Sequence, residues 1–221
     1  MFFKEEKIKK LMVLAASVLL FSLGSVLPVS WGEEVIDRIL AVVNDEVITL
    51  TDVNIVERFV LFDVPYETQD ENLQKLILDQ LINQKLVIQM TSERVEVSEE
   101  ELESLLSDIV QKTDPDLAGR ALLQFGLDWD DLKSYLREKL LYRKIISLRF
   151  DQGVIVSIEE IERYYEQVYI PSQREKNLDP QPMIDVLDQI ESALKRQKVE
   201  GQIQEWISNL KREANIQIKI S

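Results

Sequence analysis

Carboxylates are the side chains with the greatest capacity for chemistry in this sequence. The 221 residues include 40 Asp and Glu but no Cys and no His. A sequence without Cys and His excludes disulfide frameworks, thiolate or imidazole metal sites, Cys–His pairs and Ser-His-Asp triads. The catalytic chemistry that remains is paired-acid catalysis, in which one carboxyl donates a proton and a second acts as base or nucleophile.

The densest acidic runs are Glu99–Glu101 and the group Asp128, Asp130 and Asp131. Both runs precede helical patterns of apolar residues, and acids at a helix N-terminus stabilise the helix dipole. We therefore interpret them as structural. No segment of the sequence has the ligand spacing of an EF-hand loop, and the six Gly are too scattered for a phosphate-binding loop. The sequence predicts no cofactor and no metal, and it favours a non-enzymatic function.

Charge and aromatic residues point to binding rather than catalysis. Lys and Arg total 26, so the net charge is −14 and a nucleic-acid partner is disfavoured. Most aromatic residues fall in predicted helices, where core packing and an exposed groove for an extended apolar peptide are the two explanations. Tyr164 and Tyr165 cannot share one helix face, so at least one should be accessible. The candidates for such a peptide-binding groove are Phe59, Phe62, Tyr66, Phe125, Trp129, Tyr135, Tyr142, Tyr164 and Tyr165.

The elements that must position these residues are mostly helices. Apolar spacing predicts a helix that has Thr51 as its N-cap and is ended by Pro65, followed by a central helix over 73–93. The prolines within residues 169–182 break the helical pattern. Further helices are predicted after the capping boxes Ser98–Glu101 and Ser157–Glu160, over 115–126, over 129–150 after the N-cap Asp128, and over 183–214.

Short strands are predicted in two parts of the sequence, one before residue 50 and one after residue 215. Residues 35–43 are β-branched and apolar, and a turn at 44–46 returns the chain as a second strand over 47–49. Residues 216–220 alternate with period 2, which is typical of a strand with one buried face. Because only the N-terminal hairpin offers this last strand a partner, the two ends should meet in one sheet. The predicted fold class is mostly α, a multi-helix module with a small β-sheet.

The first 32 residues have the pattern of a secretory signal peptide. Lysines precede an apolar run from Leu11 to Leu23, and Ser30 and Gly32 are small residues two positions apart. The pattern predicts export and cleavage after Gly32. Because residues 11–29 approach the length that spans a bilayer, an uncleaved membrane anchor is the alternative. An exported chain without Cys folds without an oxidation step, which suits a bacterial periplasm.

Four segments, taken in order, resemble SurA-type periplasmic chaperones. Val35–Asp52 looks like the opening strand, turn, strand and capped helix of that family. Leu73–Leu106 resembles the central helix of the family followed by a capped helix start, and Phe125–Leu148 is similar to its later long helix. Trp206–Ile220 looks like the helix and strand that close the chaperone module.

The resemblance implies one chaperone module built from both ends of the chain. A SurA N-terminal-like domain over 33–168 would follow the signal peptide at 1–32, and residues 183–221 would complete the module. The family typically inserts one or two parvulin-type prolyl isomerase domains where this chain has only residues 169–182, and parvulin sites characteristically use His. We therefore expect the chaperone core without isomerase activity. The implied function is an ATP-independent holdase for unfolded outer-membrane or secreted polypeptides.

A second class of function fits the same residues. The surplus of apolar helix surface could form a fixed protein–protein interface of an assembly or structural subunit. A homodimer that exchanges its terminal helix and strand is one such arrangement. A dimer that persists on dilution would favour this alternative, and a monomer would favour the chaperone.

Overall fold

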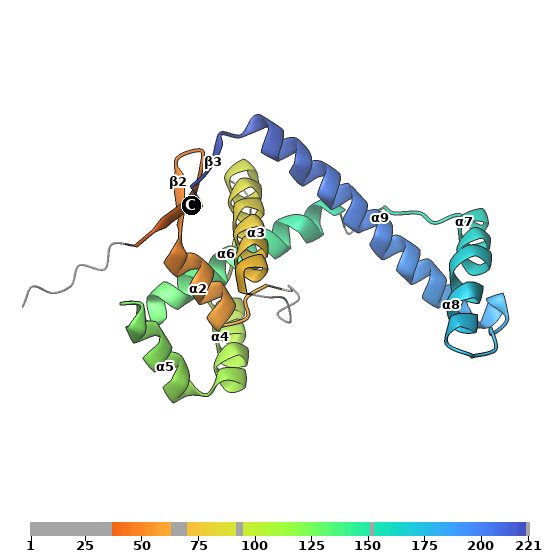
Figure 1. Ribbon diagram of the computed structural model, residues 1–221, viewed down its shortest axis with the longest axis horizontal. Coiled ribbons are helices and arrows are strands. Elements are labelled where there is room, and N and C mark those ends of the chain that lie inside the picture. Colours follow the sequence, from red (N-terminus) through yellow and green to blue (C-terminus); the bar gives the residue numbers. More distant parts are fainter. Residues whose placement is uncertain (1–36, 63–69, 92–94, 151–152, 220–221) are drawn as a thin grey trace, which may run out of the picture. The chain divides into compact units, whose positions relative to one another are not determined.

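The computed structural model describes residues 37–62, 70–91, 95–150 and 153–219, all within the compact unit Asp37–Ser221. The predicted fold class is confirmed, because helices make up most of this unit and a small three-stranded antiparallel sheet accompanies them (Figure 1). The predicted signal peptide at 1–32, Pro65 and the candidate Tyr66 lie outside the described residues.

The sheet joins residues from the two ends of the unit, as predicted. Its strands are β1 (Ile39–Val43), β2 (Glu46–Thr49) and β3 (Ile216–Ile218), in the order β2-β1-β3. β3 pairs with β1 in the register Val42 with Gln217 and Ala41 with Ile218. The predicted buried face of this last strand is wrong, because Ile218 is exposed on an edge strand. Ala41, Val43 and Ile48 are buried, so β1 and β2 carry the core side of the sheet.

The main core combines this sheet with the C-terminal half of a later helix and with five helices that precede it. They are α2 (Leu50–Arg58), α3 (Asp70–Thr91), α4 (Glu99–Thr113), α5 (Pro115–Gln124) and α6 (Trp129–Phe150). Helix α3 is central, as its apolar girth predicted, because it contacts β1, β2, α2, α6 and α9 (Met183–Glu213). The buried residues of α3 include Ile77 and Leu86, and those of α6 include Leu132 and Leu136.

A second, smaller apolar cluster follows along the chain. It contains α7 (Ile158–Tyr164), the π-helix η1 (Tyr165–Tyr169), α8 (Ile170–Glu175) and the first half of α9. Its buried residues are Ile161, Tyr169, Val186 and Ile190. The second half of α9 packs against α3 and α6 through Ile207 and Leu210. One continuous helix therefore supplies side chains to both clusters (Figure 1).

Helix boundaries confirm some sequence predictions and correct others. The capping boxes that open α4 and α7 are present, and Asp128 caps α6 through the backbone N–H groups of Asp130 and Asp131. The N-cap of α2 is Thr49 rather than Thr51, because the Thr49 hydroxyl accepts from Asp52 N while the Asp52 carboxylate accepts from Thr49 N.

Two predicted helix breaks lie elsewhere. Helix α2 ends at Arg58 rather than near Pro65. Val60, two residues later, is in the left-handed region with a φ of 50°. Residues 169–182 were predicted to be non-helical, but helix continues to Glu175. Pro171 is tolerated because it lies in the first turn of α8, where its missing N–H is not required.

The capping box of α4 predicts an acid-sensitive contribution to stability. Hydrogen bonds from Lys144 and from Ser98 lower the pKa of Glu101 from 4.5 to about 2. A carboxyl with a lowered folded-state pKa stabilises the fold above its unfolded pKa, and this stabilisation is lost as pH falls from about 4.5 towards 2. Urea unfolding of Glu101→Gln across this range should therefore show a shallower loss of stability than wild type. Glu100→Gln, which leaves the Lys144 and Ser98 contacts intact, is the control, and equal slopes for all three proteins would contradict the prediction.

Candidate peptide-binding surface

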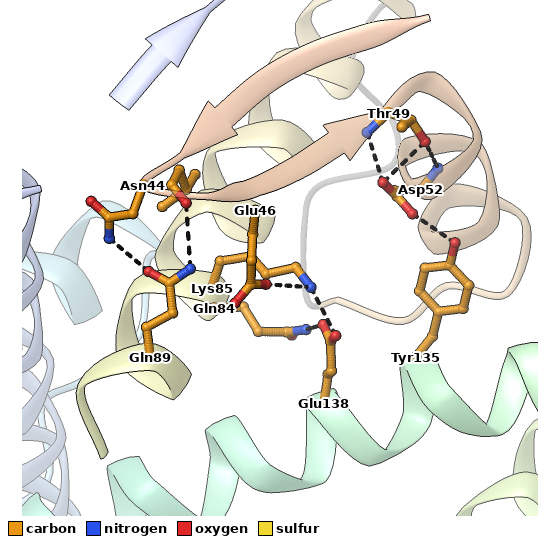
Figure 2. A network of polar contacts seen from close by, with 10 residues as sticks. Asn44, Glu46, Thr49, Asp52, Gln84, Lys85, Gln89, Tyr135 and Glu138 are labelled. Atoms are coloured by element: carbon orange, nitrogen blue, oxygen red, sulfur yellow. Dashed lines mark hydrogen bonds and ion pairs between the residues drawn. The ribbon is translucent and has the colours of Figure 1, made fainter. Parts of the chain in front are cut away.

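The candidate Tyr135 is held by an internal contact. It projects from α6 towards the start of α2, and its hydroxyl donates to Asp52 Oδ1 at 2.6 Å (Figure 2). The second oxygen of Asp52 accepts from Thr49 N at 2.7 Å, so one carboxylate serves both the helix cap and the tyrosine. Burial, reinforced by the Asp52 hydrogen bond, raises the pKa of Tyr135. The Tyr135 hydroxyl is therefore engaged within the chain, and only the apolar part of the ring would be available to a ligand.

Lys85 joins three elements beside this contact. Its Nζ lies 3.1 Å from Glu46 on β2 and 2.8 Å from Glu138 on α6, while Lys85 itself is on α3 (Figure 2). Gln84 Nε2 donates to the other oxygen of Glu138 at 3.1 Å. Burial acts to lower the pKa of Lys85, but the hydrogen bonds and charges of Glu138 and Glu46 outweigh it, so this pKa is raised. The network fixes the β1–β2 hairpin against α3 and α6.

A pocket of about 240 Å³ opens beside these contacts. Its lining mixes apolar residues of the core with polar residues of the network just described. The pocket is large enough for one side chain of a ligand. Three carboxylates and one lysine line it, so its net charge is negative and would favour a long side chain with an apolar stem and a cationic end. Its residues are Ile48, Asp52, Leu81, Lys85, Leu127, Asp131, Ser134, Tyr135 and Glu138.

The structure places the predicted aromatic candidates in different environments. Phe59 is buried in the main core. Phe62, Phe125, Tyr135 and Tyr142 are half-buried and pack against that core. Tyr164 and Tyr165 are half-buried in the second cluster, where the Tyr165 ring stacks on Tyr169 with 5.5 Å between centroids. Trp129 is the one described candidate that is classed as exposed, at 37%.

Phe125 and Trp129 were candidates from the sequence, whereas the exposed Leu123 of α5 was not. Trp129 lies against Gly119 on α5, where an added methyl group would be 3.7 Å from its ring. Leu123, one turn further along α5, is 76% exposed. We call Leu123, Phe125 and Trp129 the α5 surface. The available signal was the apolar content of 115–126, but aliphatic residues at helical spacing indicate a core face equally well.

The sequence also did not indicate an aromatic pair that joins α6 to α9. Phe150 at the end of α6 and Trp206 on α9 have ring centroids 5.5 Å apart, and the guanidinium of Arg149 lies 4.5 Å from the Trp206 ring. This cation–π contact helps to fasten α9 to α6. No pattern in the sequence relates positions so far apart.

Two other kinds of site were sought in the same parts of the chain. None of the described helices is long and apolar enough to cross a membrane. Nor do the residues described here bring three Asp or Glu side chains together in a way that could hold a metal ion.

Comparison with known proteins gives a consistent set of relatives. Residues 36–147 match the family model described as the SurA N-terminal domain. Chaperone SurA of Methylococcus capsulatus is 26% identical over 144 residues, which is 62% of this chain and 32% of that protein. Chaperone SurA of Legionella pneumophila is 23% identical over 140 residues, which is 60% of this chain and 33% of that protein. The match thus spans about a third of the length of these relatives.

Among solved structures, a SurA-like chaperone of Campylobacter jejuni covers 83% of this chain and all of its own. The two chains are 15% identical, and the TM-score is 0.48.

Proposed function

The chain belongs to the SurA N-terminal domain family, and we propose that it is an ATP-independent chaperone that holds unfolded polypeptides in the bacterial periplasm. The observation that carries the proposal is the family match over residues 36–147, which includes β1, β2 and the helices α2 to α5. Relatives that share this region bear the name of a chaperone. The proposed clients are outer-membrane barrel proteins and other secreted chains before they fold.

The proposed holding mechanism uses exposed apolar side chains. Unfolded barrel strands alternate apolar and polar residues and expose unpaired backbone, so they aggregate edge to edge. The α5 surface would cover the apolar residues of such a strand, and the pocket beside Tyr135 would accept a single side chain. Binding should be weak and reversible because ordering a flexible client costs conformational entropy. Residues 33–221 carry 22 Lys and Arg against 38 Asp and Glu, and this net charge of −16 would keep the complexes soluble.

The proposal also includes the extent of the module. We propose that residues 33–168 and 183–221 act as one unit after removal of residues 1–32, joined by 169–182 in the place where the resemblance implies an isomerase insertion. The pairing of β3 with β1 and the packing of α9 on α3 support a single unit. Prolyl isomerisation is not part of the proposed function, since the chain has no His for a parvulin-type site.

An aggregation assay tests this function. Residues 33–221, which include the whole compact unit, would be present when a urea-denatured outer-membrane barrel protein is diluted without nucleotide, and light scattering would be followed. We expect suppression at near-stoichiometric ratios. The double variant Leu123→Ser/Trp129→Ala should suppress several-fold less well, because it removes the two exposed apolar side chains of the α5 surface. Ile184→Ser, which changes an exposed apolar residue of α9 outside this surface, is the matched control.

Scattering that rises at the buffer rate even with excess wild-type chain would contradict the holdase. That result would favour the alternative function, a fixed assembly subunit. The exposed Ile155 and Ile184 would then be the residues that its interface buries. Light scattering of the chain alone separates the two functions. A dimer that persists on dilution indicates a fixed interface, and a monomer indicates transient client binding.

A further inference from the structure

A polar pocket of about 320 Å³ lies between α3, α6 and α9, away from the α5 surface. Helix α3 contributes Asn83 to its lining, α6 contributes Tyr142, and α9 contributes Gln204 and Ser208. We call it the amide pocket. Asp79 and Gln80 of α3 also line it, so this face of the central helix is polar, and Asn83 is its most buried member.

Asn83 is the side chain in this pocket that is left incompletely satisfied. It is 8% exposed, and among the described residues its Oδ1 has no hydrogen-bond partner. Its Nδ2 makes only a long contact of 3.4 Å to Asp79 Oδ2. A buried acceptor without a donor is destabilising, and an apolar residue of similar shape would avoid that cost. Because Asn83, unlike Gln84, lines a pocket, its oxygen is an acceptor that a donor from outside the chain could satisfy.

The remaining lining defines what kind of group carries that donor. Asp79 and Lys211 form an ion pair with each other, so the charged residues of the pocket neutralise one another. The Tyr142 hydroxyl makes no hydrogen bond to another residue that the structure describes, and burial raises the pKa of Tyr142, so it stays protonated and able to donate. The pocket thus presents an acceptor and a donor without net charge. A neutral group with one donor and one acceptor is the chemical match, and a peptide amide is such a group.

We propose that the amide pocket binds the backbone of an extended polypeptide segment, with Asn83 Oδ1 accepting an amide N–H and the Tyr142 hydroxyl donating to a carbonyl. Ile203 and Ile207 line the same pocket one helical turn apart and would contact the flanking aliphatic side chains. Backbone recognition suits a ligand of variable sequence because every residue except proline carries the same amide. The inference deepens the proposed chaperone function and rests on it.

Binding requires a small adjustment at Asn83. Its oxygen is sealed from solvent in the unliganded structure, so the carboxamide must turn towards the pocket. The terminal torsion of asparagine is broad, and the long contact to Asp79 opposes the rotation only weakly.

The test is a cycle between one side chain and one backbone group. The probes are a short fluorescein-labelled peptide of alternating Thr and Val and its analogue in which one central amide is an ester, which removes one N–H donor with little change of shape. Residues 33–221 should bind the ester analogue about threefold to tenfold more weakly than the amide peptide, the effect of one hydrogen bond. Asn83→Leu should bind the two probes equally, and its urea-unfolding midpoint should rise. Asn83→Ala, which adds no bulk, should also lose the discrimination.

Gln84→Leu is the matched control. Gln84 is 3% exposed and also has an unpartnered oxygen, but it does not line the pocket. It should keep the discrimination between amide and ester. If the wild-type chain binds both probes equally, or if Asn83→Leu discriminates as wild type does, Asn83 meets only water and the inference is wrong. That result leaves the chaperone function intact, whereas failure of the wild-type chain to suppress aggregation overturns the chaperone function itself.

Discussion

Replacing Leu136 with alanine is expected to lower the free energy of unfolding by about 2–5 kcal/mol. Leu136 is 0% exposed at the middle of α6, within the core that α6 shares with α3 and α4. The change removes buried methyl groups and leaves a cavity that the long, tightly packed helices close only in part. Since single domains are stable by about 5–15 kcal/mol, this loss would be visible as a large drop in the urea midpoint.

Leu148→Ala provides the matched control on the same helix. Leu148 is 67% exposed, so truncating it removes little buried surface and should change stability by no more than about 0.5 kcal/mol. Equal losses at the two positions would mean that α6 does not bury the face described here. Urea unfolding followed by circular dichroism measures both variants.

Asn44→Ala is expected to cost about 2–3 kcal/mol, although Asn44 lies in a surface turn. Its side chain donates to Gln89 at 2.7 Å, which ties the hairpin to α3 (Figure 2). It also accepts from Asn215 N at 3.0 Å, which ties the hairpin to the segment before β3. Its φ of 54° lies in the left-handed region, which alanine adopts less readily than asparagine. The variant therefore loses two hydrogen bonds and gains backbone strain.

Asn44→Gly separates these two causes. Glycine adopts the left-handed conformation freely, so this variant should lose only the side-chain hydrogen bonds, about 1–2 kcal/mol. Thermal or urea unfolding of both variants gives the comparison. Identical losses for alanine and glycine would show that the backbone of the turn is not strained by alanine.

Much of the fold was predictable because its signals are local. The capping boxes at Ser98 and Ser157 require residues only three positions apart. The apolar residues of α3 are spread over most of its circumference, which predicts a central helix. The boundaries of α2 were predicted wrongly. The signal for its N-cap is equally local, because Thr49 and Asp52 are three positions apart and form a capping box, but Thr51 is also a suitable cap residue. The left-handed Val60 that follows α2 is a conformation that β-branched residues rarely adopt, so no propensity predicts it.

The candidate site was less predictable than the fold. Aromatic content identified residues able to bind a peptide, but exposure depends on which elements pack together. Tyr135 is tied to Asp52, which is 83 residues away in the chain. The unsatisfied oxygen of Asn83 could not be inferred either, because an asparagine on an apolar helix gives no sign of whether a partner faces it. The sequence shows only that two amides, Asn83 and Gln84, lie within the predicted central helix. It does not show that the oxygen of each is left without a partner.

The pairing of β1 with β3 has a consequence for the order of folding. Asn44 and Asn215 meet across 171 positions of sequence, so the chain must close a very large loop before this pair forms. Contacts between distant residues are entropically costly and form slowly, whereas helices form within about a microsecond. The rate-limiting step of folding should therefore be the arrival of the final strand at a preassembled helical core. Mutations in β3 should slow folding only if that strand is already docked in the transition state, and otherwise they should speed unfolding.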